Sequence, residues 1–355
     1  MAEKILLTDL SYEQLRSWIA GQGERSFRGR QLFEWIYRGL ALDFAEMTNL
    51  PICLRQTLAD VAELRSLQAV DTVTSANGLT SKILFRLRDG ETIESVLMYY
   101  EGRHTICVSS QVGCAVGCPF CATGQSGFVR NLSAGEIVGQ VLHFARELRD
   151  QSSLVTNVVL MGMGEPLANY EATWRAVEIL HDHRGLGLGA RRFTVSTVGL
   201  VPGIRRLARE KLAVGLAVSL HAADDELRDR LVPVNRRHPI GKLMEACREY
   251  VRRTGRRISF EYALMEDVND DPEQARKLGR LLKGLLCHVN LIPLNPTAEC
   301  RYRPSGRKRV QAFRRVLNRT GVSNTVRLAR GIDVQAGCGQ LRSRSGSDAD
   351  KRNLE

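Results

Sequence analysis

The chain has 355 residues, of which 43% are hydrophobic and 25% charged, and its formal net charge is +12. This composition predicts a globular protein with a sizeable core; no stretch approaches the roughly 18 uncharged apolar residues of a membrane-spanning helix, and the first residues lack the apolar core of a signal peptide. Because the nine cysteines are an odd number scattered along the chain, a secreted disulfide framework is disfavoured as well, and we expect a cytoplasmic protein with no membrane partner.

The positive charge is concentrated late in the chain. Residues 1–65 hold 8 Lys and Arg against 9 Asp and Glu, whereas residues 300–355 hold 14 against 4. Such an excess favours a polyanionic partner such as a nucleic acid; the alternative is the solvated face of a helix that buries Val310, Phe313 and Val316. The candidate phosphate-binding residues are Arg301, Arg303, Arg307, Lys308, Arg309, Arg314, Arg315 and Arg319.

Residues 11–65 have the pattern of a small helical module. Apolar residues recur at helical spacing in two stretches: Tyr12, Leu15 and Ile19, and then Leu32, Trp35 and Ile36. The glycines at 21 and 23 separate the two stretches. We therefore expect a helical domain over residues 1–66.

A β-hairpin is predicted after this domain. Strand patterns over residues 81–88 and 91–100 flank Asp89-Gly90, a dipeptide that favours a tight hairpin turn. We assign residues 67–100 to this linking hairpin segment, which leads into the part of the chain that carries the chemistry.

Three cysteines follow the apolar run 105–109 in a CxxxCxxC spacing: Cys114, Cys118 and Cys121. Three thiolates are one ligand short of a closed structural zinc site and of a four-cysteine iron–sulfur cluster. The spacing therefore predicts a [4Fe–4S] cluster whose fourth iron stays open for a small molecule. A zinc site with a distant fourth ligand is the alternative.

Strands and helices alternate from residue 133 onward. The residues Ser133 to Glu136 form a capping box that begins a helix ending near Arg149. Apolar runs of strand length then occur at residues 157–161, 192–197, 214–220, 258–265 and 288–294. This alternation predicts an α/β fold with a parallel sheet covered on both faces, and functional groups are expected just after the strands end.

Polar and glycine-rich motifs follow four of these strands. They contain Gly164-Glu165, Ser196-Thr197, Ser219-Leu220-His221 and Asn295-Pro296. A carboxylate beside glycines can accept hydrogen bonds from an ammonium group, and hydroxyl, imidazole and amide groups suit the ribose and carboxylate of a nucleoside cofactor. Taken alone, residues of these kinds are more often helix caps or turn residues than ligands.

Two further cysteines stand in sequence contexts that suggest chemistry. Cys107 lies in the strand that leads into the cluster loop, and Cys338 lies in a glycine-flanked segment for which flexibility is predicted. An exposed thiol is reactive and is usually avoided unless it has a use. An inward-facing strand residue and a simple surface thiol are the respective alternatives.

Together these motifs resemble the RlmN/Cfr family of radical S-adenosylmethionine (SAM) RNA methyltransferases over nearly the whole chain. The matching segments are residues 107–114, the cysteine triplet, 127–132, 161–167, 196–197, 219–221, 291–296 and 336–341. Ala336-Gly337 departs from the family, which usually has two alanines there. The resemblance implies an incomplete (β/α)6 barrel with a small helical N-terminal domain, a radical SAM core at 101–341 and a disordered tail at 342–355.

The resemblance also implies a role for each candidate site residue. Cys114, Cys118 and Cys121 would hold the cluster. Two SAM molecules per turnover would bind to Gly164, Glu165, Ser196, Ser219, Leu220, His221 and Asn295.

The implied mechanism uses both remaining cysteines. Cys338 would take a methyl group from one SAM, and a 5′-deoxyadenosyl radical from the second would remove a hydrogen from that methyl. The methylene radical would add to adenine, and Cys107 would resolve the protein–RNA adduct through a transient disulfide with Cys338. Glu94 is the implied proton acceptor, although the choice between Glu94 and Cys107 for the ring proton stays open.

The implied substrates are C2 of adenine 2503 in 23S rRNA and C2 of adenine 37 in tRNA. The helical domain, residues 1–66, would help to bind RNA and favours the C2-specific branch of the family. An external flavodoxin-like or ferredoxin-like electron donor would be needed. The alternatives are a C8-specific, Cfr-like 23S rRNA methyltransferase and a non-catalytic, zinc-bound RNA-binding protein.

Overall fold

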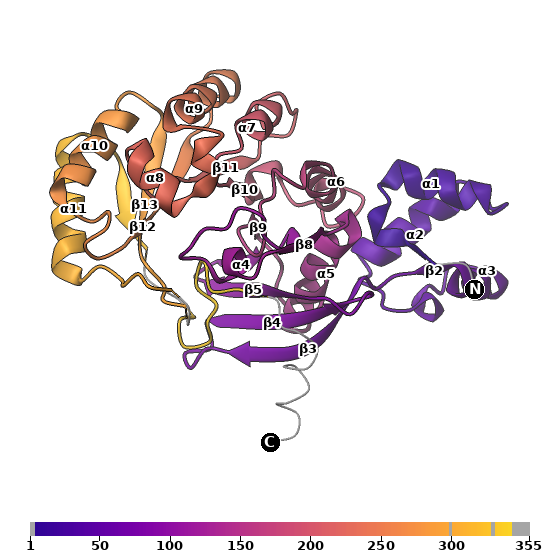
Figure 1. Cartoon of the computed structure of the whole chain (residues 1–355). Helices are drawn as coiled ribbons and strands as arrows, with labels where there is room; N and C mark the ends of the chain where they lie inside the picture. The colour runs from indigo at the N-terminus through magenta and orange to yellow at the C-terminus, as the bar shows by residue number, and fades with distance from the viewer. Residues whose placement is uncertain (1–3, 298–299, 328–330, 343–355) are drawn as a thin grey trace.

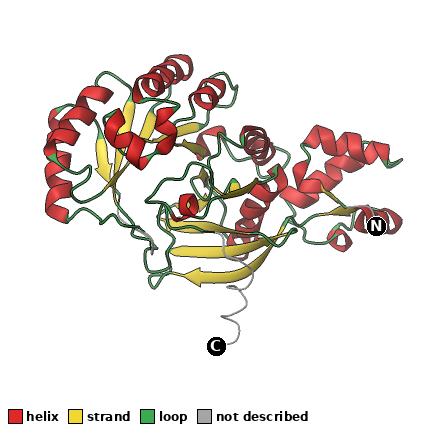
Figure 2. Cartoon of the chain, viewed as in Figure 1, coloured by secondary structure: helices red, strands yellow, loops and turns green. Residues whose placement is uncertain are grey.

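The protein is built around one large β-sheet that curves into an open barrel (Figures 1 and 2). The computed structural model describes residues 4–297, 300–327 and 331–342. Within them the sheet has ten strands in the order β14-β13-β12-β11-β10-β9-β6-β5-β4-β3. The parallel strands are β6 (Arg103–Cys107), β9 (Asn157–Leu160), β10 (Phe193–Thr197), β11 (Gly215–Ser219), β12 (Ile258–Leu264), β13 (Cys287–Pro293) and β14 (Asn324–Val326).

Helices in the connections between the parallel strands cover the outside of the sheet (Figure 1). They are α5 (Ala134–Asp150), α6 (Tyr170–His181), α7 (Val201–Leu207), α8 (Asp225–Leu231), α9 (Ile240–Thr254), α10 (Pro272–Leu282) and α11 (Arg307–Arg319), with the short 3-10 helices η3 (Ala190–Arg192) and η4 (Pro233–Arg236). Among the described residues the sheet ends at β14 and β3 and does not close on itself. The α/β fold class and the incomplete (β/α)6 barrel are confirmed.

Local sequence signals place several of these elements correctly. Ser133 Oγ accepts the Glu136 N–H at 3.1 Å and Glu136 Oε2 accepts the Ser133 N–H at 2.8 Å, so the capping box does begin α5. The five apolar runs coincide with β9 to β13 to within a few residues. Buried side chains alternate with partly buried ones along β9, β10 and β13, whereas β12 is buried almost throughout.

An antiparallel extension continues the sheet beyond β6. It consists of β3 (Leu67–Thr74), β4 (Thr80–Leu87) and β5 (Thr92–Tyr100), so the predicted hairpin is present as β4 and β5. Gly90 turns the chain between them with a φ of 88°, a left-handed conformation that favours glycine. The sequence prediction omits β3 and β14, because β3 is a partly exposed edge strand with many polar residues and β14 has only three residues.

The helical module occupies the beginning of the chain (indigo in Figure 1). It contains α1 (Tyr12–Gly21), α2 (Phe27–Tyr37), α3 (Ile52–Val61), the 3-10 helices η1 (Leu7–Asp9) and η2 (Phe44–Glu46), and the short parallel pair β1 (Ile5–Leu6) and β2 (Ala62–Glu63). Asp9 Oδ1 accepts the Gly135 N–H at 2.6 Å, and the Arg38 guanidinium donates to the His183 carbonyl at 2.6 Å. These bonds attach the module to the first two helices of the barrel.

Two sequence predictions concern membrane-spanning helices and the C-terminal tail. No helix in the described ranges combines the length and apolarity needed to cross a bilayer. Arg342 begins the expected disordered tail, and its backbone N–H bonds to Glu94; the remaining tail, residues 343–355, lies outside the described residues.

Candidate active site

The loop that carries the cysteine triplet is closed at its base by a small antiparallel pair, β7 (Gln111–Gly113) and β8 (Phe128–Asn131). The Cys114 N–H donates to the Gly127 carbonyl at 2.6 Å. A Cβ on Gly113 would stand 2.0 Å from that same carbonyl oxygen, so this crossing requires glycine. The short helix α4 (Ala122–Gln125) completes the loop directly after the third cysteine.

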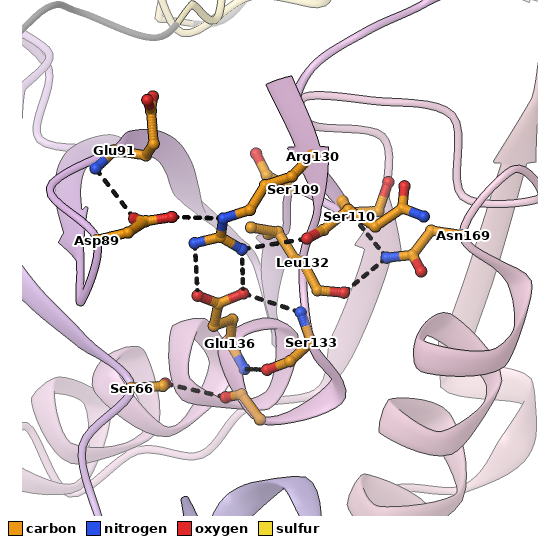
Figure 3. A network of polar contacts seen from close by, with 12 residues as sticks. Ser66, Asp89, Glu91, Ser109, Ser110, Arg130, Leu132, Ser133, Glu136 and Asn169 are labelled. Atoms are coloured by element: carbon orange, nitrogen blue, oxygen red, sulfur yellow. Dashed lines mark hydrogen bonds and ion pairs between the residues drawn. The ribbon is translucent and has the colours of Figure 1, made fainter. Parts of the chain in front are cut away.

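A polar network fixes the base of this loop to the barrel (Figure 3). Arg130 on β8 donates to Asp89 Oδ2 at 2.6 Å and makes two bonds of 2.8 and 2.9 Å to the Glu136 carboxylate. Asn169 Nδ2 donates to the carbonyls of Ser110 and Leu132, both at 2.8 Å. The loop is thereby joined to the β4–β5 turn, to the start of α5 and to the connection after β9.

A cavity of about 1070 Å³, open to solvent, lies at the carboxyl ends of the parallel strands. The residues that the sequence assigns to the cluster and to SAM meet there, with the exception of Leu220. They are Cys114, Cys118, Cys121, Gly164, Glu165, Ser196, Ser219, His221 and Asn295. Cys338 lines the same cavity.

The thiol set of this cavity fits an iron–sulfur cluster. No three metal-binding side chains in residues 4–297, 300–327 and 331–342 are grouped so that they could hold one ion. A [4Fe–4S] cluster makes no such demand, because each thiolate binds a different iron. Burial raises the pKa of Cys114 to about 12 and that of Cys118 well above its ordinary value, so metal binding must displace both protons.

Glu165 is held deep in the cavity wall. Its carboxylate accepts the Leu167 N–H at 3.1 Å and the Val198 N–H at 2.8 Å, and its own N–H donates to Gln111 at 2.8 Å. Burial raises the pKa of Glu165 to about 7, although these donors act in the opposite direction. A buried carboxylate with such a pKa is suited to a cationic ligand group, whose charge would favour the ionised form.

His221 follows β11 in a left-handed conformation, with a φ of 60°. Its Nδ1 accepts the Ala263 N–H at 3.0 Å, and the ring packs edge-on against Phe120 at 5.0 Å. Desolvation, and then the charge of Arg228, lower the pKa of His221 to about 3. The ring is therefore neutral, carries its proton on Nε2 and presents a donor.

Leu220 differs from the other predicted SAM-binding residues. Its side chain is fully buried outside the cavity lining. Its backbone N–H donates to the Glu261 carbonyl at 3.0 Å, and its carbonyl accepts from Arg228 Nε at 3.0 Å.

The segment around Cys338 is anchored on both sides of the thiol, in contrast to the predicted flexibility. Asn295 Nδ2 donates to the Cys338 carbonyl at 3.1 Å, and Gln340 Nε2 donates to the Pro296 carbonyl at 2.8 Å. On α4, the Ala122 N–H donates to the Gly339 carbonyl at 2.8 Å, and Thr123 Oγ1 donates to the Leu341 carbonyl at 2.6 Å. Cys338 is exposed, yet surrounding protein raises its pKa, an effect that the nearby Arg327 charge opposes.

Glu94 lies next to the segment that carries Cys338. It lines neither the cavity described above nor the second cavity described below. Its carboxylate pairs with Lys82 Nζ at 3.0 Å, with side chains 1% and 4% exposed respectively, and accepts the Arg342 N–H at 3.1 Å. Lys82 also donates to the Gln335 carbonyl at 3.2 Å. The pair therefore holds the Cys338 segment from the hairpin side.

Cys107 lines a second cavity that adjoins the first. Cys338 lines it as well, so the two thiols predicted to react with each other share one space. Burial raises the pKa of Cys107 to about 12, with a further contribution from Cys338. Both thiols are free in this structure.

Sequence reasoning misses three charged residues of the site. Glu261 on β12 lines the first cavity, and its buried Oε2 has no hydrogen-bond partner among the described residues. Arg327 stands 3.7 Å from that oxygen and lines the second cavity. The buried Arg228 donates to the carbonyls of Val198, Ser219 and Leu220. The sequence signals only Glu261, as a glutamate inside an apolar strand, and that signal is weak.

The predicted basic segment lies on the outside of the barrel. Helix α11 buries Val310, Phe313 and Leu317 and leaves Val316 half-buried, so its apolar face is close to the predicted one. Arg309 is committed to Asp267 and Asp270, with both ion pairs at 2.7 Å. The other basic side chains of this helix remain candidates for phosphate contacts.

Comparison with known proteins identifies the family. Residues 5–64 match the model for the ribosomal RNA large subunit methyltransferase N-terminal domain, and residues 108–279 match the radical SAM superfamily. A probable dual-specificity RNA methyltransferase RlmN from Roseiflexus castenholzii is 48% identical, covering 94% of this chain and 95% of the relative. Dual-specificity RNA methyltransferase RlmN 1 from Myxococcus xanthus is 50% identical, with coverage of 95% and 94%.

A solved structure agrees with this assignment. The crystal structure of a radical SAM methyltransferase from Sphaerobacter thermophilus is 54% identical and superposes with a TM-score of 0.94, covering 95% of this chain and 99% of its own. The helical module and the barrel thus both match one kind of enzyme. The chain belongs to the RlmN family of radical SAM RNA methyltransferases.

Proposed function

We propose that this enzyme methylates C2 of adenine 2503 in 23S rRNA and C2 of adenine 37 in tRNA, with two SAM molecules consumed per turnover. The observation that supports it best is the position of Cys338. This thiol stands between a cavity lined by the predicted cluster and SAM residues and a cavity lined by Cys107. A methyl group on Cys338 could therefore react with the SAM-derived radical in the first cavity and be delivered to adenine in the second.

The residues of the first cavity would hold the cofactors. Cys114, Cys118 and Cys121 would ligate the cluster, which when bound supplies the electron that cleaves SAM to a 5′-deoxyadenosyl radical. Glu165 would accept hydrogen bonds from the SAM ammonium group, and the neutral His221 would donate from Nε2.

Cys338 performs the transfer in this proposal. Its thiolate attacks the methyl carbon of the first SAM, forming S-methylcysteine and releasing S-adenosylhomocysteine. One hydrogen atom passes from that methyl group to the 5′-deoxyadenosyl radical, and the resulting methylene radical adds to the adenine ring. The adduct then loses the ring proton and one electron, which the cluster would take back. Cys107 attacks the Cys338 sulfur to form a disulfide, the C–S bond breaks, and the carbon left on the base takes up a proton to become the methyl group. An external reductant restores both thiols.

Glu94 is the proposed proton acceptor, but its surroundings set a condition. Lys82 and the Arg342 N–H bond to its carboxylate, and the residue lines neither cavity. For Glu94 to reach the adenine ring proton, the Cys338 segment must shift away from the hairpin.

We further propose the partners and the location of the reaction. The helical module, residues 1–66, acts as an RNA-binding accessory domain, and a flavodoxin-like or ferredoxin-like protein delivers electrons. The cytoplasm, where thiols are kept reduced, suits an enzyme that must reopen its own disulfide.

Nucleoside mass spectrometry tests the proposed activity. The reconstituted protein, SAM and a reductant are incubated anaerobically with 23S rRNA and with tRNA, and the digested RNA is analysed. 2-Methyladenosine is expected from both RNAs, whereas Cys338→Ala should give none because the methyl acceptor is missing. 8-Methyladenosine would instead identify the C8-specific activity, and cleavage of SAM without any methylated base from the unaltered protein would contradict the proposal.

SAM affinity is expected to rise with pH around neutrality. Glu165 binds an ammonium group only when ionised, and its pKa is raised to about 7, so the ionised fraction grows as the pH increases through that value. Binding near pH 6 should be about fivefold weaker than near pH 7, a range in which an α-ammonium group keeps its proton. Equilibrium SAM binding checks this. Glu165→Gln should bind weakly at both pH values, and a pH-independent affinity in the unaltered protein would contradict the role of Glu165.

A further inference from the structure

The second cavity occupies the open side of the barrel. It has a volume of about 710 Å³, part of which is open to solvent. Met98 and Tyr100 on β5 line one side of it, and Arg327, which directly follows β14, lines the other. Because β14 ends the sheet and β5 begins the antiparallel extension, the cavity lies where the barrel wall is incomplete. Its lining thus comes from the two sides of this gap in the barrel wall.

Cys338 marks the boundary between the two cavities. Gly164, Glu165 and His221 line only the first cavity, whereas Cys107 lines only the second. In the proposed reaction the methyl on Cys338 must meet the SAM-derived radical on one side and the adenine on the other. Resting on that proposed function, we infer that the target adenine, unstacked from its RNA, binds in the second cavity against Tyr100 and Arg327.

The walls of this cavity suit a planar base. Most of the lining is apolar and comes from Met98, Val159, Met161, Ile292, Ala336 and Leu341. The Tyr100 ring is held in place, because the Arg103 guanidinium stacks on it at 4.2 Å and its hydroxyl donates to Met98 Sδ at 3.6 Å. A fixed aromatic ring beside an apolar floor is the arrangement on which proteins stack unpaired bases.

Arg327 supplies the polar contact. Its backbone N–H donates to the Leu291 carbonyl at 2.9 Å, which fixes the residue at the end of β14. Its guanidinium carries only donors, and the adenine ring nitrogens N1 and N3, which flank C2, are acceptors. Arg327 can therefore donate a hydrogen bond to the ring edge that carries the reacting carbon.

Adduct formation in a Cys107→Ala background tests the inference, because that variant traps the base on Cys338. Tyr100→Ala removes the stacking surface and Met98→Trp fills the cavity. Each is expected to slow formation of the RNA adduct about tenfold or more, the size of a lost base–aromatic stack. Methylation of Cys338 by SAM, followed by the mass of the intact protein without RNA, should proceed at the unchanged rate.

A matched variant controls for the loss of bulk. Tyr99→Ala removes an equal ring from the opposite face of β5, where it packs on His104 at 5.4 Å. It should form the adduct at the background rate. Adduct formation at that rate in Tyr100→Ala and Met98→Trp would overturn the inference, as would a parallel loss of Cys338 methylation. Absence of any adduct in the Cys107→Ala parent would instead contradict the proposed function.

Discussion

The Cys107→Ala protein is expected to accumulate as a covalent complex with its RNA. In the proposed reaction the base becomes bonded to Cys338 before Cys107 attacks, and no other cysteine lines the second cavity with them. Turnover should therefore stop after one addition per chain. Denaturing gel electrophoresis would show RNA that migrates with the protein, and nucleoside analysis would show almost no released methylated adenosine.

Cys53→Ala provides the matched control for this experiment. Cys53 is an exposed free thiol on α3, so the substitution removes a cysteine without touching the site. It should release methylated RNA like the unaltered protein. Free, methylated RNA from Cys107→Ala at the normal rate would show that another group resolves the adduct.

Lys82→Met is expected to destabilise the protein strongly and to stop methylation. The change leaves the Glu94 carboxylate buried without its cation, a situation that costs about 3–5 kcal/mol. It also removes the bond from Lys82 to the Gln335 carbonyl, so the Cys338 segment loses its support on the hairpin side. Denaturant unfolding measures the first effect, and the rate of Cys338 methylation by SAM measures the second.

Two further variants separate charge from packing. Lys82→Met combined with Glu94→Gln removes both charges and should recover much of the lost stability, because no unpaired ion remains. Arg88 follows β4 in the hairpin, and Arg88→Met breaks its half-exposed pair with Glu63 on β2. This change should alter the free energy of unfolding by less than about 1 kcal/mol. An equally small effect of Lys82→Met would show that its pair with Glu94 is not buried in solution.

The sequence predicts the parts of this molecule that depend on local pattern. The cysteine spacing, the capping box at Ser133 and the apolar runs of β9 to β13 each specify their structure within a short stretch. The polar motifs after the strands meet in one cavity because parallel strands all end on the same side of the sheet. The position of most of the predicted cofactor-binding residues therefore follows once the fold class is known.

Contacts between distant parts of the chain are not predictable in this way. Lys82 and Arg327 look like ordinary surface cations in the sequence, and only the docked Cys338 segment and the open barrel edge give them roles. The flexibility expected for that segment was inferred from its glycines. Those glycines instead allow close approach, since a Cβ on Gly337 would lie 2.6 Å from Asn295 Nδ2.

The docking of residues 331–342 connects the order in which the protein folds with the number of SAM molecules consumed for each RNA methylated. This segment is bound by the hairpin, by α4 and by the end of β13, all of which precede it in the chain by at least 35 residues. Non-local contacts of this kind form late. In the proposed reaction, the site that generates the radical can thus be complete before Cys338, whose methyl group would react with that radical, is in place. Partial opening of the segment would uncouple SAM consumption from RNA methylation, leaving an enzyme that wastes its cofactor.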